Sequence, residues 1–160
     1  MELVELTIDE VRPLRTAVLR PHYEAGRLAE FEGDEAESTH HYGLRIDGGE
    51  VVAVVTYMRV EAPDDLGGPA ARLRGMAVAE GRRREGLGAR LLQGSLTRLA
   101  VAEPDLKIVW CNARTSAADF YSREGFQRHG EVFEVPEIGP HVVMWRSMPT
   151  AEALEGVTTA

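Results

Sequence analysis

A predicted strand, a basic turn with two spaced glycines and an apolar-faced helix follow one another between residues 70 and 102. The strand is Ala70–Ala79, and the turn reads Arg82-Arg83-Arg84-Glu85-Gly86-Leu87-Gly88. The predicted helix, Gly86–Ala102, has its leucines on one side, as a helix packed on a sheet requires. This strand–turn–helix unit predicts an α/β or α+β fold in which helices cover a sheet.

The turn has the chemistry of an anion site. The first amides of a helix have no partner inside the helix, and the helix dipole adds partial positive charge at that end. Gly86 and Gly88 leave the backbone open to a ligand, while Arg83 and Arg84 add full charge beside it. The alternative is a solvated arginine run, but the preceding strand and the apolar helix favour a phosphate site.

Two commoner phosphate loops do not match this turn. Gly81 and Gly86 have the Walker spacing, but Leu87-Gly88 stands where lysine and then serine or threonine are required. The dinucleotide-binding fingerprint needs a third glycine three residues after Gly88, and Leu91 stands there. The turn therefore belongs to another class of phosphate site.

The rest of the chain alternates between strand and helix patterns. Thr7 and Glu10 have the spacing of a capping box, and Pro21 should end the helix that follows. Asp47-Gly48-Gly49 predicts a hairpin turn, and the polarity change near Gly75 predicts a bulge or kink. Further strands are predicted at Glu2–Thr7, His41–Ile46, Val51–Val60, Leu106–Cys111, Phe126–Val135 and His141–Trp145, with a short helix at Ser116–Glu124.

Size and composition limit the possible functions. A chain of 160 residues fits one domain, predicted at 1–148, followed by a tail at 149–160. The net charge of −8 argues against general nucleic-acid binding. The longest apolar run, Val51–Val55, is too short for a membrane span, and the N-terminus lacks a secretory pattern. These features predict a cytoplasmic protein that does not act at a membrane.

The remaining polar residues give weaker signals. Cys111 ends an apolar run and is interpreted as a buried hydrophobe. The five histidines lack the clustered carboxylates of a metal site, so no metal is expected. The acidic segment Glu24–Thr39 is either a solvated loop or a rim that attracts a positively charged amine.

The motifs together resemble one family. The pattern Arg83-x-x-Gly86-x-Gly88, after Met76-Ala77-Val78, resembles the acyl-CoA signature of the GCN5-related N-acetyltransferase (GNAT) family. Asn112-Ala113-Arg114 follows the next predicted strand, and the run from Ala117 to Phe126 resembles the second conserved block. The run from Gly130 to Met144 resembles a subgroup of small bacterial members. The likeness covers Leu3 to Trp145, nearly the whole chain.

The resemblance implies a fold and a cofactor site. The fold is a mixed, mostly antiparallel central sheet with helices on both faces and a splayed strand pair that holds acyl-CoA. The Met76–Val78 backbone would contact the pantetheine arm, and amides of the turn would hold the pyrophosphate. The residues implied in cofactor binding are Met76, Ala77, Val78, Arg83, Arg84, Glu85, Gly86, Leu87, Gly88, Ala89, Asn112, Ala117 and Tyr121.

The resemblance also implies catalytic residues. Tyr121 matches the family's general acid, and a phenol with a pKa of about 10 can protonate a departing thiolate. The alternative is a core tyrosine beside Phe120 and Phe126. Some members have a glutamate base on the strand before the turn, where this chain has Arg72 and Arg74. His41 is the candidate base, with adjacent His40 and a water chain as alternatives.

The predicted function is transfer of an acetyl group from acetyl-CoA to a primary amine by direct attack. The acceptor is a small amine or a peptide. The resemblance implies that its pocket is formed by the variable first half, Val11–Thr39, where no motif identifies the acceptor. One alternative is a non-catalytic acyl-CoA-binding sensor of the same fold. Another is a protein that binds nucleotide phosphates without CoA. Homodimers are common among such relatives.

Overall fold

The structure, a computed structural model, describes residues 1–64 and 66–150. Within them the chain forms seven strands and three α-helices. The strands are β1 (Glu2–Glu5), β2 (His40–Arg45), β3 (Val51–Arg59), β4 (Ala70–Val78), β5 (Ile108–Arg114), β6 (Gln127–Val135) and β7 (Gly139–Ser147). The helices are α1 (Ile8–Leu19), α2 (Leu87–Ala102) and α3 (Ala118–Arg123). This is the element order that the sequence predicted.

The strands form one mixed sheet in the order β1-β2-β3-β4-β5-β7-β6. The pairs β1–β2, β2–β3, β5–β7 and β6–β7 are antiparallel. The start of β4 pairs with β5 in parallel, with Ala70 opposite Ile108 and Arg72 opposite Trp110. The predicted mixed, mostly antiparallel sheet is therefore confirmed.

The chain divides into two compact units. The first unit contains Met1–Met58 and Leu73–Leu99, and the second contains Arg59–Arg72 and the chain from Ala100 onward. The single domain predicted at 1–148 stays a prediction. Residues 151–160, most of the predicted tail, lie outside the described residues.

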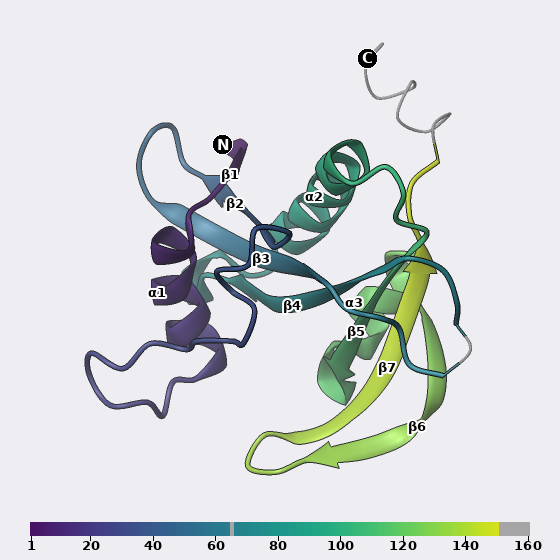
Figure 1. Ribbon diagram of the computed structural model, residues 1–160. Helices are drawn as coiled ribbons and strands as arrows, with labels where there is room; N and C mark the ends of the chain where they lie inside the picture. The colour runs from purple at the N-terminus through teal and green to yellow at the C-terminus, as the bar shows by residue number, and fades with distance from the viewer. Residues whose placement is uncertain (65, 151–160) are drawn as a thin grey trace. The chain divides into compact units, whose positions relative to one another are not determined.

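In the first unit, helices cover both faces of β3. Thr56 on β3 accepts a hydrogen bond from Arg15 on α1, whereas the next residue, Tyr57, shares one with Ser95 on α2. Neighbouring residues of a strand point to opposite faces, so α1 and α2 lie on opposite sides of β3, which can be followed in Figure 1. Burial on both faces explains why β3 is almost continuously apolar.

The start of α1 follows the predicted capping box. The Thr7 hydroxyl accepts a hydrogen bond from the Glu10 amide, and the Glu10 carboxylate accepts one from the Thr7 amide at 3.0 Å. The helix ends at Leu19, two residues before Pro21. Val11 is fully buried in a cluster with Leu6, Val54 and Ala77. This cluster fixes α1 against β3 and the end of β4.

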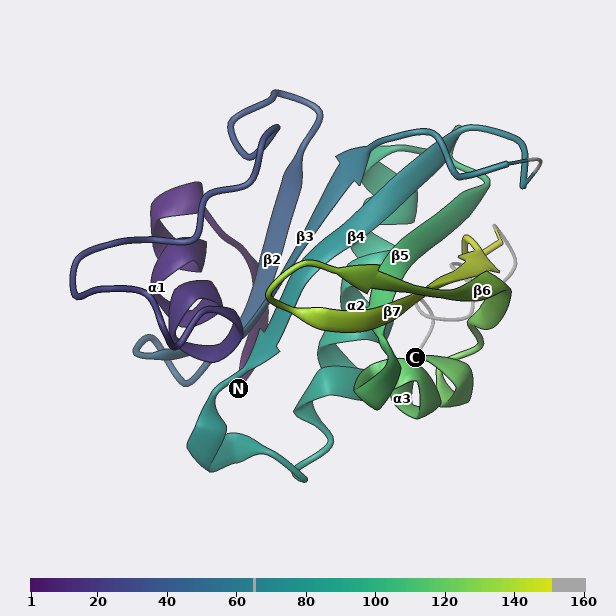
Figure 2. The ribbon, with the colours of Figure 1, turned by 90° about the horizontal axis from the view of Figure 1, so that it is seen from below.

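In the second unit, α3 lies on one face of the β5–β7–β6 strands. Arg146 on β7 donates to the carbonyl of Glu124, which follows α3. Val142 and Met144 lie four and two residues before Arg146 on β7, so they point to the same face as Arg146, and both are buried. Trp145 has the opposite parity and pairs in register with Trp110, so the two tryptophans share the other face. The β6–β7 hairpin can be followed in Figure 2.

Most predicted element boundaries differ from the structure by one to three residues, and two of these differences concern the predicted site. The α2 helix begins at Leu87, because Gly86 has a φ of +75° and cannot belong to a right-handed helix. Asn112 lies within β5, which continues to Arg114, so it does not follow the strand as predicted. Antiparallel pairing with β7 extends β5 to Arg114. This pairing depends on a distant segment, so the local residue types did not indicate where the strand ends.

Candidate functional site

The predicted phosphate turn lies in the first unit, between β4 and α2. A short 3-10 turn covers Glu80–Arg82, and the segment up to Gly86 projects before α2 begins (Figure 2). Arg84 and Gly86 both have positive φ angles, of 69° and 75°. These two left-handed residues turn the chain from the strand direction into the helix.

The start of α2 leaves backbone donors unpaired within the helix. Its first intrahelical hydrogen bond runs from the Arg90 amide to the Gly86 carbonyl, at 3.1 Å. The amides of Leu87, Gly88 and Ala89 precede it and have no partner in the helix. A Cβ atom added at Gly86 would have no neighbour within 4 Å, so the backbone there is open. The turn thus presents the donors that an anion needs.

The basic side chains of the turn are exposed. Arg83 and Arg84 are both exposed, and Glu85 beside them is 3.6 Å from Arg82 in an ion pair. Arg82 is thus partly neutralised, whereas Arg83 and Arg84 form no ion pair with another described residue. These two cations are the ones that can attract a phosphate group to the turn.

The strand before the turn bends at Gly75, which has a φ of +61°. A Cβ atom there would lie 2.9 Å from Nε of Arg15 and 3.0 Å from the Phe31 ring. Glycine is therefore required both by the backbone angle and by the close approach of these side chains. The predicted kink near Gly75 has this physical cause. After it, Ala77 is buried, while Met76 and Val78 are half-buried.

A buried ionic network lies beside this bend. Arg15 is fully buried, and its terminal nitrogens donate to the Asp34 carboxylate at 2.8 and 3.0 Å. Arg15 also donates to the Ala29 carbonyl and to the Thr56 hydroxyl. Asp34 accepts the Phe31 amide at 2.8 Å. The network therefore connects α1, the acidic segment and β3.

Phe31 is held by two cations of this region. The guanidinium carbon of Arg15 lies 4.1 Å from the centre of the Phe31 ring, and that of Arg74 lies 4.2 Å from it. Each contact is a cation–π interaction. Arg74 comes from β4, one residue before Gly75. These contacts fix the acidic segment against the bend in β4.

His41, the candidate base, belongs to the same network. It is 6% exposed, and its Nε2 donates to the Asp34 carbonyl at 3.0 Å. Its Nδ1 then accepts from the Thr56 hydroxyl at 2.7 Å, which is consistent with Thr56 accepting from Arg15. Both ring nitrogens are occupied. This geometry supports a structural role and does not support the predicted role as base.

The same surroundings keep His41 neutral. Burial lowers the pKa of His41, and the positive charge of Arg15 lowers it further, against the opposing effect of the hydrogen bond to Asp34. A proton on Nδ1 would also remove the acceptor of the Thr56 hydroxyl. The imidazole therefore acts here as a fixed hydrogen-bonding group.

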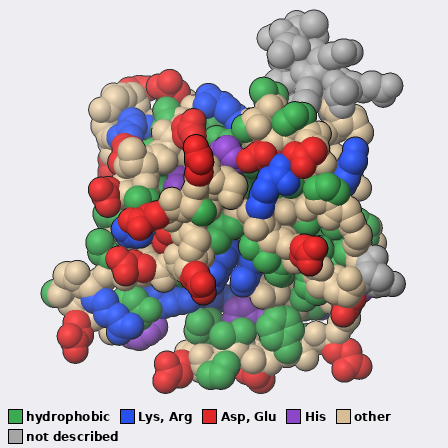
Figure 3. All heavy atoms as spheres, in the orientation of Figure 1, with side chains coloured by type: hydrophobic (Ala, Val, Ile, Leu, Met, Phe, Trp, Pro, Cys, Tyr) green, Lys and Arg blue, Asp and Glu red, His purple; other side chains and the backbone are tan. Residues whose placement is uncertain are grey.

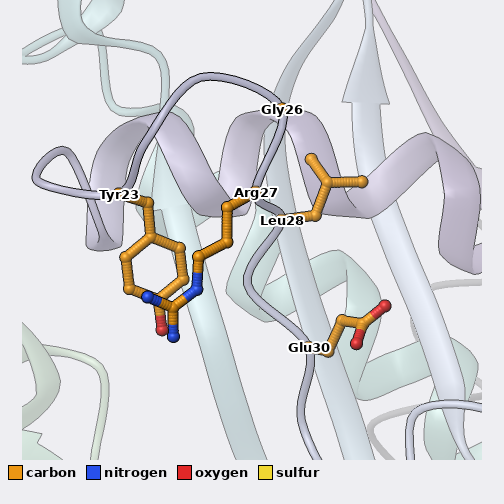
Figure 4. A pocket seen from close by; sticks show the side chains of 5 residues that line it. All are labelled: Tyr23, Gly26, Arg27, Leu28 and Glu30. Carbon is orange, nitrogen blue, oxygen red and sulfur yellow. The ribbon is translucent and has the colours of Figure 1, made fainter.

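The acidic segment lines two shallow pockets of the first unit. One, of about 360 Å³, is shown in Figure 4 and lies among Tyr23, Gly26, Arg27, Leu28 and Glu30. Arg27 lies over the Tyr23 ring, 3.9 Å from its centre. The other, of about 440 Å³, is lined by Arg12 and by residues 30–36. Both lie in the region where the acceptor pocket is expected.

Negative charge exceeds positive charge around the second pocket. Arg12 lies 3.7–4.0 Å from oxygens of Asp9, Glu30, Asp34 and Glu35. The side chains of Glu30 and Glu35 are 69% and 78% exposed. Figure 3 shows acidic side chains spread over the face in view. This pocket therefore attracts cations, in line with the rim interpretation of the segment.

Tyr121, the predicted general acid, lies on α3 in the second unit. It is 8% exposed, and its ring lies 5.2 Å from Phe120 and 5.3 Å from Phe126, both edge-on. These are the aromatic neighbours expected of a core tyrosine, and they also hold a catalytic ring in one orientation. The acid role stays a prediction.

The other site residues predicted in the second unit are half-buried. Asn112 lies on β5 opposite Val143, and Ala117 lies in a short 3-10 turn before α3. Cys111 is 2% exposed, and burial raises the pKa of its thiol to about 12. Cys111 is therefore unsuited to nucleophilic attack.

Within residues 1–64 and 66–150, no group of three or more metal-ligating side chains lies together. No helix among the described residues is long and apolar enough to cross a membrane.

Sequence reasoning missed the Arg15–Asp34 pair and its partners. One signal was present: Arg15 lies four residues after Val11 and three before Val18, on the apolar side of α1. An arginine that is fully buried on an apolar face is usually paired with a carboxylate. The sequence could not identify Asp34 as that partner among the many acids of the segment.

Comparisons with known proteins agree on one family. The family model described as "Acetyltransferase (GNAT) domain" matches residues 20–144. An "Uncharacterized N-acetyltransferase YitI" of Bacillus subtilis is 31% identical over 151 residues, which cover 94% of this chain and 99% of the relative.

Two solved structures have a similar fold. That of Escherichia coli ElaA has a TM-score of 0.69 and 23% identity, over 91% of this chain and 99% of the other. An aminoglycoside 6′-N-acetyltransferase complexed with coenzyme A has a TM-score of 0.68 and 13% identity, over 94% and 99%. At these identities the likeness concerns the fold alone.

Proposed function

The chain belongs to the GNAT acetyltransferase family, and from this premise we propose that it transfers an acetyl group from acetyl-CoA to a primary amine by direct attack. Membership of the family makes it an acetyltransferase. The donor, the acceptor class and the mechanism are the proposal. The cytoplasmic location and the homodimer expected from the sequence stay predictions.

The observation that carries the proposal is the turn before α2. The amides of Leu87, Gly88 and Ala89 precede the first intrahelical bond, and Arg83 and Arg84 are exposed beside them. A diphosphate matches this combination of free donors and positive charge. A related fold has been solved with coenzyme A, which contains such a diphosphate. We propose that Arg83–Ala89 binds it.

The backbone of β4 has the next role in the proposal. After the bend at Gly75, the segment Met76–Val78 would hydrogen-bond the pantetheine arm of the donor. The amide of Val78 would polarise the thioester carbonyl and stabilise the negative charge that develops on its oxygen. Asn112 and Ala117 would contribute hydrogen bonding and space for the arm.

The chemical step moves two protons. The amine nitrogen attacks the carbonyl carbon, the new C–N bond forms, and the C–S bond breaks. Tyr121 would donate its phenolic proton to the departing thiolate sulfur. The amine loses one proton, which we assign to water because both ring nitrogens of His41 are occupied. The phenol is then restored from solvent.

A thiol-release assay tests the proposal. Purified protein is mixed with acetyl-CoA, a panel of primary amines and a reagent that reports free thiols. We expect thiol release that depends on an amine and is accompanied by the acetylated amine in the mass spectrum. Saturable acetyl-CoA binding without thiol release on any amine would instead indicate a non-catalytic sensor.

A competition titration tests the donor. If the turn recognises coenzyme A through its diphosphate and the strand through its arm, CoA should displace a bound acetyl-CoA analogue far better than ATP does. Equal displacement by ATP would support the alternative of a site for nucleotide phosphates alone.

A further inference from the structure

Arg72, in the second unit, is a half-buried cation that forms no ion pair with another residue among 1–64 and 66–150. Its guanidinium carbon lies 5.2 Å from the centre of the Trp110 ring. Its Nε atom is buried and has no hydrogen-bond partner in the described chain. No ion pair or hydrogen bond with any described residue involves its terminal amino groups, which retain exposure. A ligand can therefore reach them.

Several other arginines have carboxylate partners, whereas the half-buried Arg20 and Arg146 donate to backbone carbonyls. Arg15 pairs with Asp34, Arg45 with Glu10, and Arg59 with Glu103. A guanidinium stays protonated in proteins, so its burial without a counter-ion costs free energy. Burial lowers the pKa of Arg72, whereas the adjacent Cys111 offers no counter-charge because its own pKa is raised. A half-buried guanidinium with exposed terminal amino groups is therefore a candidate binding group for an anionic ligand.

Arg72 lies on a partly covered face of the sheet, where Ala70, Ile108 and Trp110 are buried and Ala62 and Leu66 pack against them. Arg72 shares this face with Trp110, Asn112 and Trp145, and α3 lies on the opposite face. No aspartate or glutamate lies on this face of the three strands. The positions concerned are residues 70 and 72 of β4, 108, 110, 112 and 114 of β5, and 141, 143, 145 and 147 of β7. Asp64, from the loop after β3, is bonded to His129. None of these positions therefore supplies a negative charge to Arg72.

We infer that the acceptor amine carries a carboxylate, which Arg72 binds on this face of the sheet. The inference rests on the proposed function, because it names the acceptor class of the same reaction. A planar guanidinium can donate two parallel hydrogen bonds to one carboxylate. The cation–π contact with the Trp110 ring holds the Arg72 guanidinium in one orientation. An amino acid, with its amine close to its carboxylate, has this chemistry.

A carboxylate matches the site better than a phosphate. Arg72 supplies one positive charge, and a carboxylate supplies one negative charge, whereas a phosphate monoester carries nearly two at neutral pH. An aminoalkyl phosphate nevertheless offers the same kind of oxygen acceptors. The experiment therefore includes it as a separate arm.

Matched acceptors test the inference. Thiol release is measured with three kinds of acceptor. These are amino acids, their amides, in which a neutral carboxamide replaces the carboxylate, and an aminoalkyl phosphate. We expect the amino acids to have a KM about tenfold or more below that of their amides, as loss of a charge-assisted interaction predicts. Equal or better use of the amides overturns the inference, and preference for the phosphate overturns the choice of carboxylate.

Variants connect that preference to Arg72. Arg72→Gln should raise the KM for amino acids about tenfold or more and leave the amides unchanged, while Arg72→Lys should retain part of the preference. Arg128→Gln is the matched control, because Arg128 is exposed on β6 and pairs with Met144, on the face of α3. An unchanged preference in Arg72→Gln overturns the inference.

Stability separates binding from a structural role. Removing an unpaired half-buried charge should leave Tm unchanged or raise it. If Arg72→Gln lowered Tm by several degrees and Arg72→Lys restored Tm without changing the preference for amino acids, Arg72 would be structural. That result would overturn the inference.

Tryptophan fluorescence decides the matter even if the proposed function fails. The sequence has two tryptophans, Trp110 and Trp145, and both lie on the face of Arg72. Titration with amino acids should give a saturable change that their amides and the Arg72→Gln variant lack. With no thiol release on any amine, this change would still support a carboxylate site at Arg72, and its absence would overturn it.

Discussion

Arg15 and Asp34 form a two-point ion pair in which the side chains are 0% and 2% exposed. Burial by itself would raise the pKa of Asp34, but the hydrogen bonds from Arg15 and from the Phe31 amide outweigh it and hold the pKa below its usual value. The pair joins α1 to the acidic segment beside the bend in β4. Its loss should therefore affect the stability of the first unit.

Asp34→Asn should lower the free energy of unfolding by about 3–5 kcal/mol, because it leaves the Arg15 charge buried without a counter-ion. Urea denaturation monitored by circular dichroism measures the change. Glu35→Gln is the control, since the Glu35 side chain is 78% exposed, and it should change stability by less than about 0.5 kcal/mol. Equal stability of Asp34→Asn and the wild type would show that the pair contributes nothing.

Stability should fall as pH drops below about 6.5, the pKa of an unperturbed histidine. His41 is kept neutral in the folded chain because burial lowers its pKa. Below that pH the unfolded chain binds a proton that the folded chain does not, so the free energy of unfolding decreases by up to about 1.4 kcal/mol per pH unit. Asp34 does not contribute in this range, because its lowered pKa lies far below it.

Urea denaturation at pH 7.5, 6.5 and 5.5 checks this dependence. His41→Gln removes the titrating group and should flatten the decrease between pH 6.5 and 5.5. His22→Gln, at an exposed position, should leave it as in the wild type. A decrease that persists undiminished in His41→Gln would assign it to another group.

Gly75→Ala should destabilise the protein by about 1–3 kcal/mol, because a non-glycine residue is strained at positive φ and its Cβ would meet a neighbour. The added atom would lie 2.9 Å from Nε of Arg15. Gly81→Ala is the control, because a Cβ there would have no neighbour within 4 Å. Thermal unfolding compares the two, and an equal Tm would mean that β4 needs no bend at Gly75.

Local patterns in the sequence predicted most of the fold. The capping box at Thr7, the turn at Gly48 and the leucine face of α2 each depend on residues close together in the chain, so one segment contains the whole signal. The kink at Gly75 was visible as a change of polarity. Its cause was not, because Arg15 and Phe31 approach it from distant parts of the sequence.

The candidate site was predicted unevenly for the same reason. The turn around Gly86 is contiguous, and its resemblance to a known signature located it directly. His41 was chosen as a candidate base from its residue type and strand position alone. Its occupied ring nitrogens depend on Asp34 and Thr56, whose proximity only the fold determines. Arg72 was noted only as a departure from the family pattern, since a missing partner cannot be seen in a sequence.

Gly86→Val should weaken acetyl-CoA binding at least about tenfold, because a β-branched side chain would block the approach of the diphosphate to the amides of α2. Its control is Gly48→Val, because Gly48 has the same φ of 75° and equally open space. Backbone strain is thus matched. Isothermal titration measures both affinities, and wild-type affinity in Gly86→Val would remove the phosphate site from this turn.

Tyr121→Phe should lower kcat about 100-fold or more while changing acetyl-CoA affinity little, because a general acid acts in the transition state. The substitution retains the ring that contacts Phe120 and Phe126, so packing is preserved. Tyr57→Phe removes another buried hydroxyl, which is bonded to Ser95, and should reduce stability but not kcat. If kcat in Tyr121→Phe equals that of the wild type, Tyr121 is a packing residue and water protonates the departing thiolate.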